Sequence, residues 1–184
     1  MISEELEVLK IVVERLDKCR IKYIVSGSIA MNFYAPPRMT RDIDIVVELP
    51  MSKAEDIYNL FKGDFYIDSG SVVEAINEKG MFNVIHNEKV IKIDFIIAKD
   101  TDYEKVKFQR RVLKDIEGVR LSIISVEDLV LSKLLWAKDS HSQLQFIDVK
   151  NIISFNRGGL NLDYLQKWAD RLSVENFLKE CAGA

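Results

Sequence analysis

Two aspartates, Asp42 and Asp44, stand one residue apart at the start of an apolar run. Strand side chains alternate between two faces, so both carboxylates would point to one side while Ile43 and Ile45 point into the core. Asp is disfavoured in strands, and two like charges about 4 Å apart repel by roughly 4 kcal/mol at an effective dielectric of 20. The pair therefore predicts a compensating cation.

Asp94 repeats this arrangement as a lone acid in a second apolar run, residues 90–97. If the two strands are neighbours, three carboxylates converge. Oxygen ligands without nitrogen or sulfur suit Mg²⁺ or Mn²⁺ rather than zinc. The alternative interpretation is that Asp42 begins a turn, Asp44 faces water on an edge strand and Asp94 is unrelated to either.

Gly27 and Ser28 lie between a β-prone run and the start of a helix. Free backbone amides and the helix dipole favour a phosphate at such a place, and glycine lets the backbone approach it closely. Gly-Ser is also a common turn without function. The order of glycine turn, paired aspartates and third strand aspartate is more specific than any one of these features.

The elements that must position these residues follow from periodicity and turn signals. Strands are expected at 23–25 and 43–48, with hairpins at 82–97 and 113–124. Helices are expected up to about Cys19, at 29–34, after a Ser52 cap over 54–61, from a capping box at Ser125 through Trp136, and near 143–153, 163–172 and 174–179. This pattern predicts an α+β fold, a mixed β-sheet flanked by helices, with a domain at 1–124 and a helical C-terminal segment at 125–184 packed on it.

Composition narrows the class of protein. The net charge of -3, from 26 Lys and Arg against 29 Asp and Glu, does not favour a general nucleic-acid coat. Two distant cysteines and two distant histidines leave little for a zinc module, a disulfide framework or a Ser-His-Asp hydrolase. Neither a signal peptide nor a transmembrane helix is evident, so we expect a cytoplasmic protein with no membrane partner.

Segments 25–30, 37–46 and 93–95 together resemble the signature of the DNA polymerase β-like nucleotidyltransferase superfamily. The branch they resemble most is the AbiEii-like group, which includes toxins of bacterial toxin–antitoxin pairs. The resemblance implies a nucleotidyltransferase fold and a reaction in which a hydroxyl attacks the α-phosphate of an NTP and pyrophosphate leaves. The acceptor is left open between a tRNA end, a protein hydroxyl and a small molecule such as an antibiotic, and an antitoxin is an expected partner.

The resemblance also implies roles for individual residues. Asp42 and Asp44 would hold the metal bound to the triphosphate, and Asp94 would join them on a second metal and help to activate the hydroxyl. The β- and γ-phosphates would be cradled by Gly27 and Ser28. Triphosphate charge would be neutralised by Arg38 and Arg41, whose alternative is to be solvated loop arginines.

Lys133 lies in an expected helix that is apolar on nearly every side. Its side chain either reaches the rim of the buried region or turns into the cleft toward a phosphate or an acid. Asp128 is either a capping acid or a site residue, and Asp148 could pair with a neighbour. A basic run could form a surface for RNA or a solvated face, and it comprises Lys105, Lys107, Arg110, Arg111 and Lys114.

Two hypotheses of different class remain beside the active transferase. One is a catalytically inactive nucleotide-binding or protein-interaction module that keeps the same fold. The other is a Mg²⁺-dependent phosphohydrolase that uses the same acids and needs no acceptor.

Overall fold

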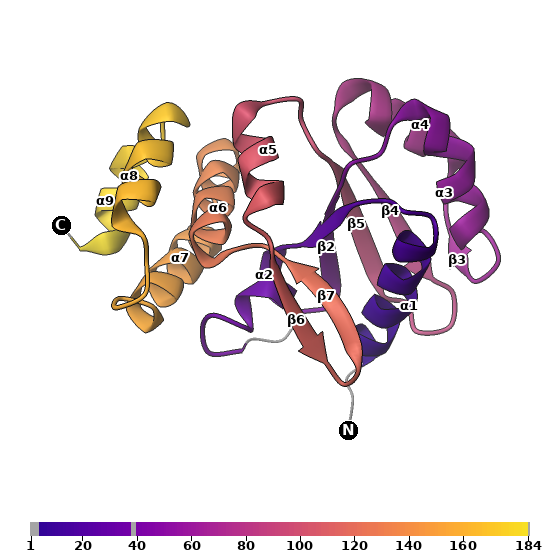
Figure 1. Cartoon of the computed structure of the whole chain (residues 1–184), viewed down its shortest axis with the longest axis horizontal. Coiled ribbons are helices and arrows are strands. Elements are labelled where there is room, and N and C mark those ends of the chain that lie inside the picture. Colours follow the sequence, from indigo (N-terminus) through magenta and orange to yellow (C-terminus); the bar gives the residue numbers. More distant parts are fainter. Residues whose placement is uncertain (1–3, 38–39, 184) are drawn as a thin grey trace.

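The computed structural model describes residues 4–37 and 40–183 of the chain (Figure 1). Within these residues one sheet of seven strands has the order β3-β4-β5-β2-β1-β7-β6. The strands are β1 (Tyr23–Val25), β2 (Asp42–Val47), β3 (Phe65–Tyr66), β4 (Met81–His86), β5 (Lys92–Ile97), β6 (Val112–Ile116) and β7 (Val119–Ile123). The helices are α1 (Glu4–Lys18), α2 (Gly27–Met31), the 3₁₀ turn η1 (Met51–Lys53), α3 (Ala54–Phe61), α4 (Ser69–Glu78), α5 (Asp102–Gln109), α6 (Val126–Ser140), α7 (Gln143–Phe155), α8 (Leu162–Arg171) and α9 (Glu175–Ala182).

The predicted fold class, a mixed sheet flanked by helices, is confirmed. Strand β2 pairs in parallel with β5, while β1 pairs antiparallel with β2 and parallel with β7. Both predicted hairpins are present, as β4–β5 and β6–β7. The sheet is therefore built around β2, which is its central strand.

One predicted helix cap is wrong, and the sequence did not predict two of the helices or the short strand β3. Helix α3 begins after Lys53 without a side-chain cap, because Ser52 lies inside the 3₁₀ turn, so the predicted Ser52 cap is wrong. Helix α4, capped by Asp68, was not predicted, and neither was α5, capped by Thr101. Helix α5 carries charged residues around most of its surface, so it lacks a clear apolar stripe to identify it.

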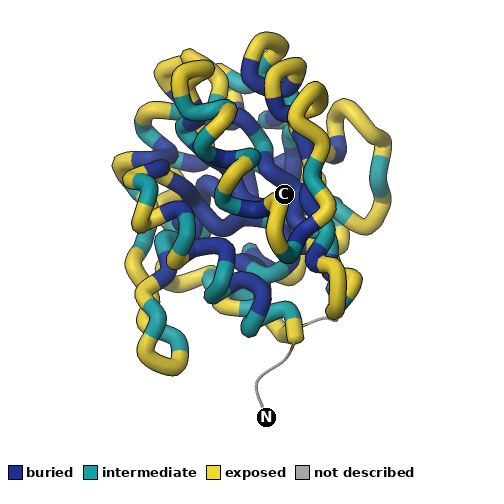
Figure 2. Tube along the Cα trace, turned by 90° about the vertical axis from the view of Figure 1, so that its right-hand side faces the viewer, coloured by how far each residue is buried: buried dark blue, intermediate teal, exposed yellow. Residues whose placement is uncertain are grey.

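The two faces of the central strands differ in burial. Ile43 and Ile45 of β2 and Ile93 and Phe95 of β5 are fully buried on one face, and they form part of a continuous core. On the other face Asp42 is exposed and Asp44 is half-buried. Figure 2 shows this buried interior surrounded by exposed outer segments. The alternation thus leaves the acids on the more open face of the sheet.

Helices α6 to α9 gather at one end of the molecule, with the described C-terminal end beside them (Figure 1). Asp128, which has no exposed surface, links this group to the sheet part. Its carboxylate accepts hydrogen bonds from Ser125 Oγ at 2.6 Å and from Tyr164 OH at 2.7 Å, and Nε of Arg110, the residue after α5, lies 3.3 Å from it. These contacts come from helix α8, from the residue that follows α5 and from the β7–α6 junction.

The division into domains at 1–124 and 125–184 stays a prediction. In residues 4–37 and 40–183, no helix has the length and apolar character needed to cross a bilayer.

Candidate active site

Asp44 and Asp94 lie side by side on neighbouring strands. The parallel register of β2 and β5 pairs Asp44 with Asp94 and Asp42 with Lys92, so all four side chains project from the same face. Since β2 is central in the sheet, the alternative in which Asp44 faces water on an edge strand is wrong. The structure therefore brings the three predicted acids to one face at one end of the strand pair.

Gly27 is fitted against the Asp44 carboxylate. It follows β1 as the first residue of α2, with a φ of +60° that L side chains rarely adopt. A Cβ atom at this position would lie 1.8 Å from Asp44 Oδ2. The amide of Ser26 also donates to the Asp44 carbonyl oxygen at 2.9 Å. The glycine is thus required by backbone conformation and by the space that Asp44 occupies.

The charge of Asp44 is strongly disfavoured where it lies. Burial, and after it the charge of Asp94, raises the pKa of Asp44 to about 6, while Lys133 acts in the opposite direction. The charge of Asp42 raises the pKa of Asp44 by a smaller amount, and the charge of Lys92 lowers it by a smaller amount. A bound cation therefore stabilises the ionised form of this buried carboxyl more than it would stabilise an exposed carboxylate.

Lys92 supplies a positive charge within the acidic group. Its Nζ lies 2.9 Å from Asp94 Oδ2 and 3.7 Å from Asp42 Oδ2. Asp94, through the hydrogen bond it accepts, raises the pKa of the Lys92 ammonium, so the lysine is charged at neutral pH. Sequence reasoning missed this residue, although it lies two positions before Asp94 in the same strand and must share its face.

The donor set fits a divalent cation of the Mg²⁺ or Mn²⁺ type. Asp94 Oδ1 is buried, and among the described residues it has no hydrogen-bond partner. Asp44 and Asp94 offer oxygen ligands alone, which is the preference of these ions. As their side chains stand, however, no three acids, cysteines or histidines of the described residues are grouped closely enough to hold a metal. Metal binding by Asp42, Asp44 and Asp94 together stays a prediction.

Lys133 turns out to be buried and paired rather than placed at the rim. Its Nζ lies 2.7 Å from Asp148 Oδ2 and donates to Gln145 Oε1 at 3.1 Å. The side chains of Lys133 and Asp148 are 5% and 1% exposed. The effect of Lys133 on the Asp44 pKa shows that its charge is also felt at the acids. Gln145 is a further neighbour that the sequence did not single out.

The other predicted site residues are less closely grouped. Ser28 is buried in α2, one residue after Gly27. Arg41 is exposed just before β2. Arg38 lies outside the described residues. Nucleotide binding by Gly27, Ser28, Arg38, Arg41 and Lys133 stays a prediction.

Asp128 has a structural role at the N-terminus of helix α6. Its amide donates to Ser125 Oγ, as the predicted cap requires, and its carboxylate is occupied by the contacts described above. Two residues of the basic run also make internal contacts, because Lys107 is buried against Glu104 and Arg110 pairs with Glu127 at 2.7 Å. The run is therefore only in part a solvated surface.

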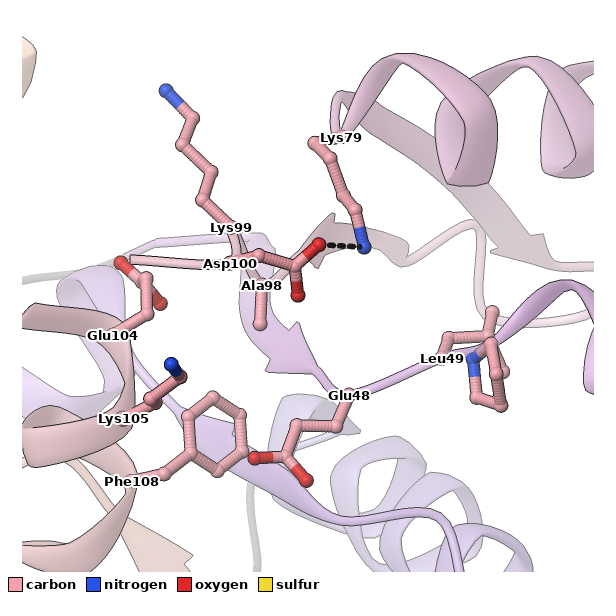
Figure 3. A pocket seen from close by; sticks show the side chains of 10 residues that line it. Glu48, Leu49, Lys79, Ala98, Lys99, Asp100, Glu104, Lys105 and Phe108 are labelled. Carbon is pink, nitrogen blue, oxygen red and sulfur yellow. Dashed lines mark ion pairs between the residues drawn. The ribbon is translucent and has the colours of Figure 1, made fainter. Parts of the chain in front are cut away.

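A cavity of about 350 Å³ lies at the other end of the central strands, just beyond the ends of β2 and β5. Figure 3 shows its lining, in which Lys79 and Asp100 form an ion pair at 3.1 Å. Charges of both signs line the cavity, together with the ring of Phe108. None of the predicted site residues contributes to this lining.

No protein-family model and no curated protein sequence matches this chain. Solved structures do match. An antigenic nucleotidyltransferase-like protein from Paracoccidioides brasiliensis is 18% identical, with a TM-score of 0.55 over 99% of this chain and 94% of that protein. The antibiotic-resistance factor ANT(2″)-Ia, in complex with adenylyl-2″-tobramycin, is 12% identical, with a TM-score of 0.57 over 92% of this chain and 97% of that one.

A third neighbour is the lincosamide antibiotic adenylyltransferase LnuA with lincomycin bound. It is 13% identical, with a TM-score of 0.51 over 84% of this chain and 98% of that one. At such identities the likeness concerns the fold. The chain thus has the fold of nucleotidyltransferases, as the sequence resemblance implied, while nothing in these matches bears on the AbiEii-like branch.

Proposed function

We propose that this protein is a metal-dependent nucleotidyltransferase that moves an NMP from an NTP to a hydroxyl acceptor. The observation that carries the proposal is the parallel register that sets Asp44 beside Asp94, with Gly27 pressed against the Asp44 carboxylate. A structural role alone does not account for two adjacent acids in the middle of a sheet, one of them with an unpartnered buried oxygen. The shared fold with adenylyltransferases agrees with it.

In the proposed reaction the acceptor oxygen forms a bond to the α-phosphorus, and the bond to the β-phosphate oxygen breaks. Pyrophosphate leaves, and the hydroxyl proton passes to a base in the site or to solvent. Asp42, Asp44 and Asp94 are the proposed holders of Mg²⁺ or Mn²⁺. When bound, two such ions would supply charge stabilisation for the entering and leaving oxygens.

The chain's own groups have distinct proposed tasks around that centre. The Gly27 backbone, which approaches without a side chain, and Ser28 would contact the β- and γ-phosphates. Arg38 and Arg41, which precede β2 in the sequence, would offset triphosphate charge.

Lys133 is held in place by Asp148, so its proposed role is a fixed positive potential rather than a mobile phosphate ligand.

The acceptor is the open part of the proposal. Two fold neighbours were solved with an antibiotic or its adenylyl derivative, so a small hydroxylated molecule is the first acceptor class to test. A tRNA end, a protein hydroxyl, an antitoxin partner and a toxin role rest on the sequence resemblance alone. The cytoplasmic location likewise rests on the sequence.

The test is label transfer from α-³²P-labelled ATP, GTP, CTP and UTP with Mg²⁺ to hydroxylated antibiotics, tRNA and cell-extract fractions. We expect Asp94→Asn to lower transfer by about 100-fold. Asp100→Asn removes the same charge from an exposed position just beyond the same strand and should retain wild-type activity.

Undiminished transfer by Asp94→Asn would refute the assigned site. If the wild type transfers no label but binds NTP, the inactive nucleotide-binding module is the better description. Release of free nucleotide or phosphate without any acceptor would instead indicate the phosphohydrolase.

A further inference from the structure

Among residues 4–37 and 40–183, the positive charge that pairs with the Asp94 carboxylate comes from the same strand. Lys92 Nζ is 2.9 Å from Asp94 Oδ2 and 3.7 Å from Asp42 Oδ2, so it bridges two of the three acids. The third acid, Asp44, is the register partner of Asp94. The ammonium group therefore lies where the mutual repulsion of the carboxylates most requires a cation.

The pairing of Asp94 is incomplete. Its Oδ2 is bound to Lys92, whereas its Oδ1 is buried with no partner in the described part of the chain. One ammonium group therefore leaves part of the coordinating capacity of these acids unused. A divalent cation that needs several carboxylate oxygens would have to compete with Lys92 for Asp94 Oδ2.

The Lys92 side chain is able to leave. It is 38% exposed, whereas the Asp94 side chain is only 10% exposed. A long flexible stem can carry the ammonium group into water at small cost, while the acid stays in the sheet. Exchange of the lysine for another cation thus requires no change in the backbone.

We propose that Lys92 is an internal counter-ion of the acidic site, which holds Asp94 and Asp42 in the metal-free protein and is displaced when a divalent cation binds. The inference deepens the proposed function and rests on it. Because ion binding must break the lysine pairs, the protein without substrate binds metal weakly. The nucleotide, which brings its own oxygen ligands, then favours uptake of the metal–nucleotide complex.

The first experiment measures Mn²⁺ affinity by electron paramagnetic resonance, without nucleotide, for the wild type, Lys92→Met and Lys79→Met. Lys79 is the matched control, since it is 39% exposed and pairs with Asp100 at 3.1 Å, away from the acids. We expect Lys92→Met to bind Mn²⁺ about twofold to fivefold more tightly, the factor associated with breaking a partly exposed ion pair. Lys79→Met should match the wild type. Equal or weaker binding by Lys92→Met would overturn the inference.

A second measurement uses the unmodified chain and does not depend on a variant that folds. Lysine labelling by reductive methylation, followed by mass spectrometry, should show that Mn²⁺ increases modification of Lys92 and leaves Lys79 unchanged. Unchanged or decreased labelling of Lys92 at saturating Mn²⁺ would overturn the inference.

The two proposals can fail separately. If Mn²⁺ binds and label is transferred but the Lys92 results are negative, only the counter-ion role is lost. If Lys92→Met gains metal affinity while no NTP is ever consumed, only the transferase is lost. Absence of Mn²⁺ binding in every variant, with or without NTP, would refute both.

Discussion

Replacing Asp44 by Asn should make the metal-free protein more stable at neutral pH. Burial and the neighbouring acids raise the pKa of Asp44 from 3.8 to about 6. A group with a raised folded-state pKa binds more protons in the folded than in the unfolded protein between these values, so its effect on stability becomes less favourable as the pH rises through that window. Above pH 6 the folded protein carries the full cost of the ionised carboxylate.

The size of this cost follows from the shift. At about 1.4 kcal/mol per pKa unit the cost is about 3 kcal/mol, and partial solvent access at Asp44 reduces it to about 2 to 3 kcal/mol. Asn keeps the shape that fits against Gly27 and removes the charge. We therefore expect Asp44→Asn to gain about 2 to 3 kcal/mol of unfolding free energy at pH 7.5, and little at pH 4.

The assay is urea unfolding in EDTA, followed by tryptophan fluorescence at several values of pH. Asp100→Asn is the control, because the Asp100 side chain is 86% exposed and its removal should change stability by less than about 0.5 kcal/mol. A variant at position 44 that is no more stable than the wild type at pH 7.5, or a gain that does not depend on pH, would refute the reasoning. Saturating Mg²⁺ should reduce the difference in stability between Asp44→Asn and the wild type, since the ion would stabilise only the protein with a charged carboxylate at position 44.

Three further variants test other contacts. Gly27→Ala should lower the free energy of unfolding in urea by at least about 2 kcal/mol, because residue 27 has a positive φ and a Cβ there would collide with Asp44. The same substitution should weaken NTP binding. Unchanged stability would contradict the close contact with Asp44. Lys133→Met should cost about 3 to 5 kcal/mol by removing the ammonium group that offsets the buried charge of Asp148. Combining it with Asp148→Leu should recover most of the loss, whereas an additive double variant would exclude coupling. Asp128→Ala should lower the free energy of unfolding by about 3 kcal/mol and make residues 125–184 more susceptible to limited proteolysis. An unchanged cleavage pattern would contradict the role of Asp128 in linking these helices to the sheet.

The sequence predicts the shared face of Asp42 and Asp44 because strand alternation is a local property. The placement of Asp94 beside them is not a local property, since it depends on the parallel pairing of β2 with β5. Periodicity tells which residues form strands but not which strands become neighbours. The resemblance to nucleotidyltransferases supplied that expectation, and the register agrees with it.

Two other features, helix α5 and the Lys133–Asp148 pair, could not be predicted from sequence patterns, each for a physical reason. Helix α5 has no clear apolar stripe, so only its Thr101 cap could have indicated it. The pairing of Lys133 with Asp148 depends on how α6 and α7 pack, which no spacing within either helix reveals. Lys92, by contrast, could have been found, because the alternation used for Asp42 and Asp44 also places Lys92 with Asp94.

The crossover between β2 and β5 determines when the acidic group assembles during folding. Parallel neighbours cannot be joined by a tight turn, and here the connection contains η1, α3, β3, α4 and β4. The entropy of closing so long a loop must be overcome before these contacts form, so we expect them to form late in folding. Lys92 and Asp94 arrive together on one strand, so the last acid comes with an opposite charge of its own. Completing the group therefore adds no net charge to it.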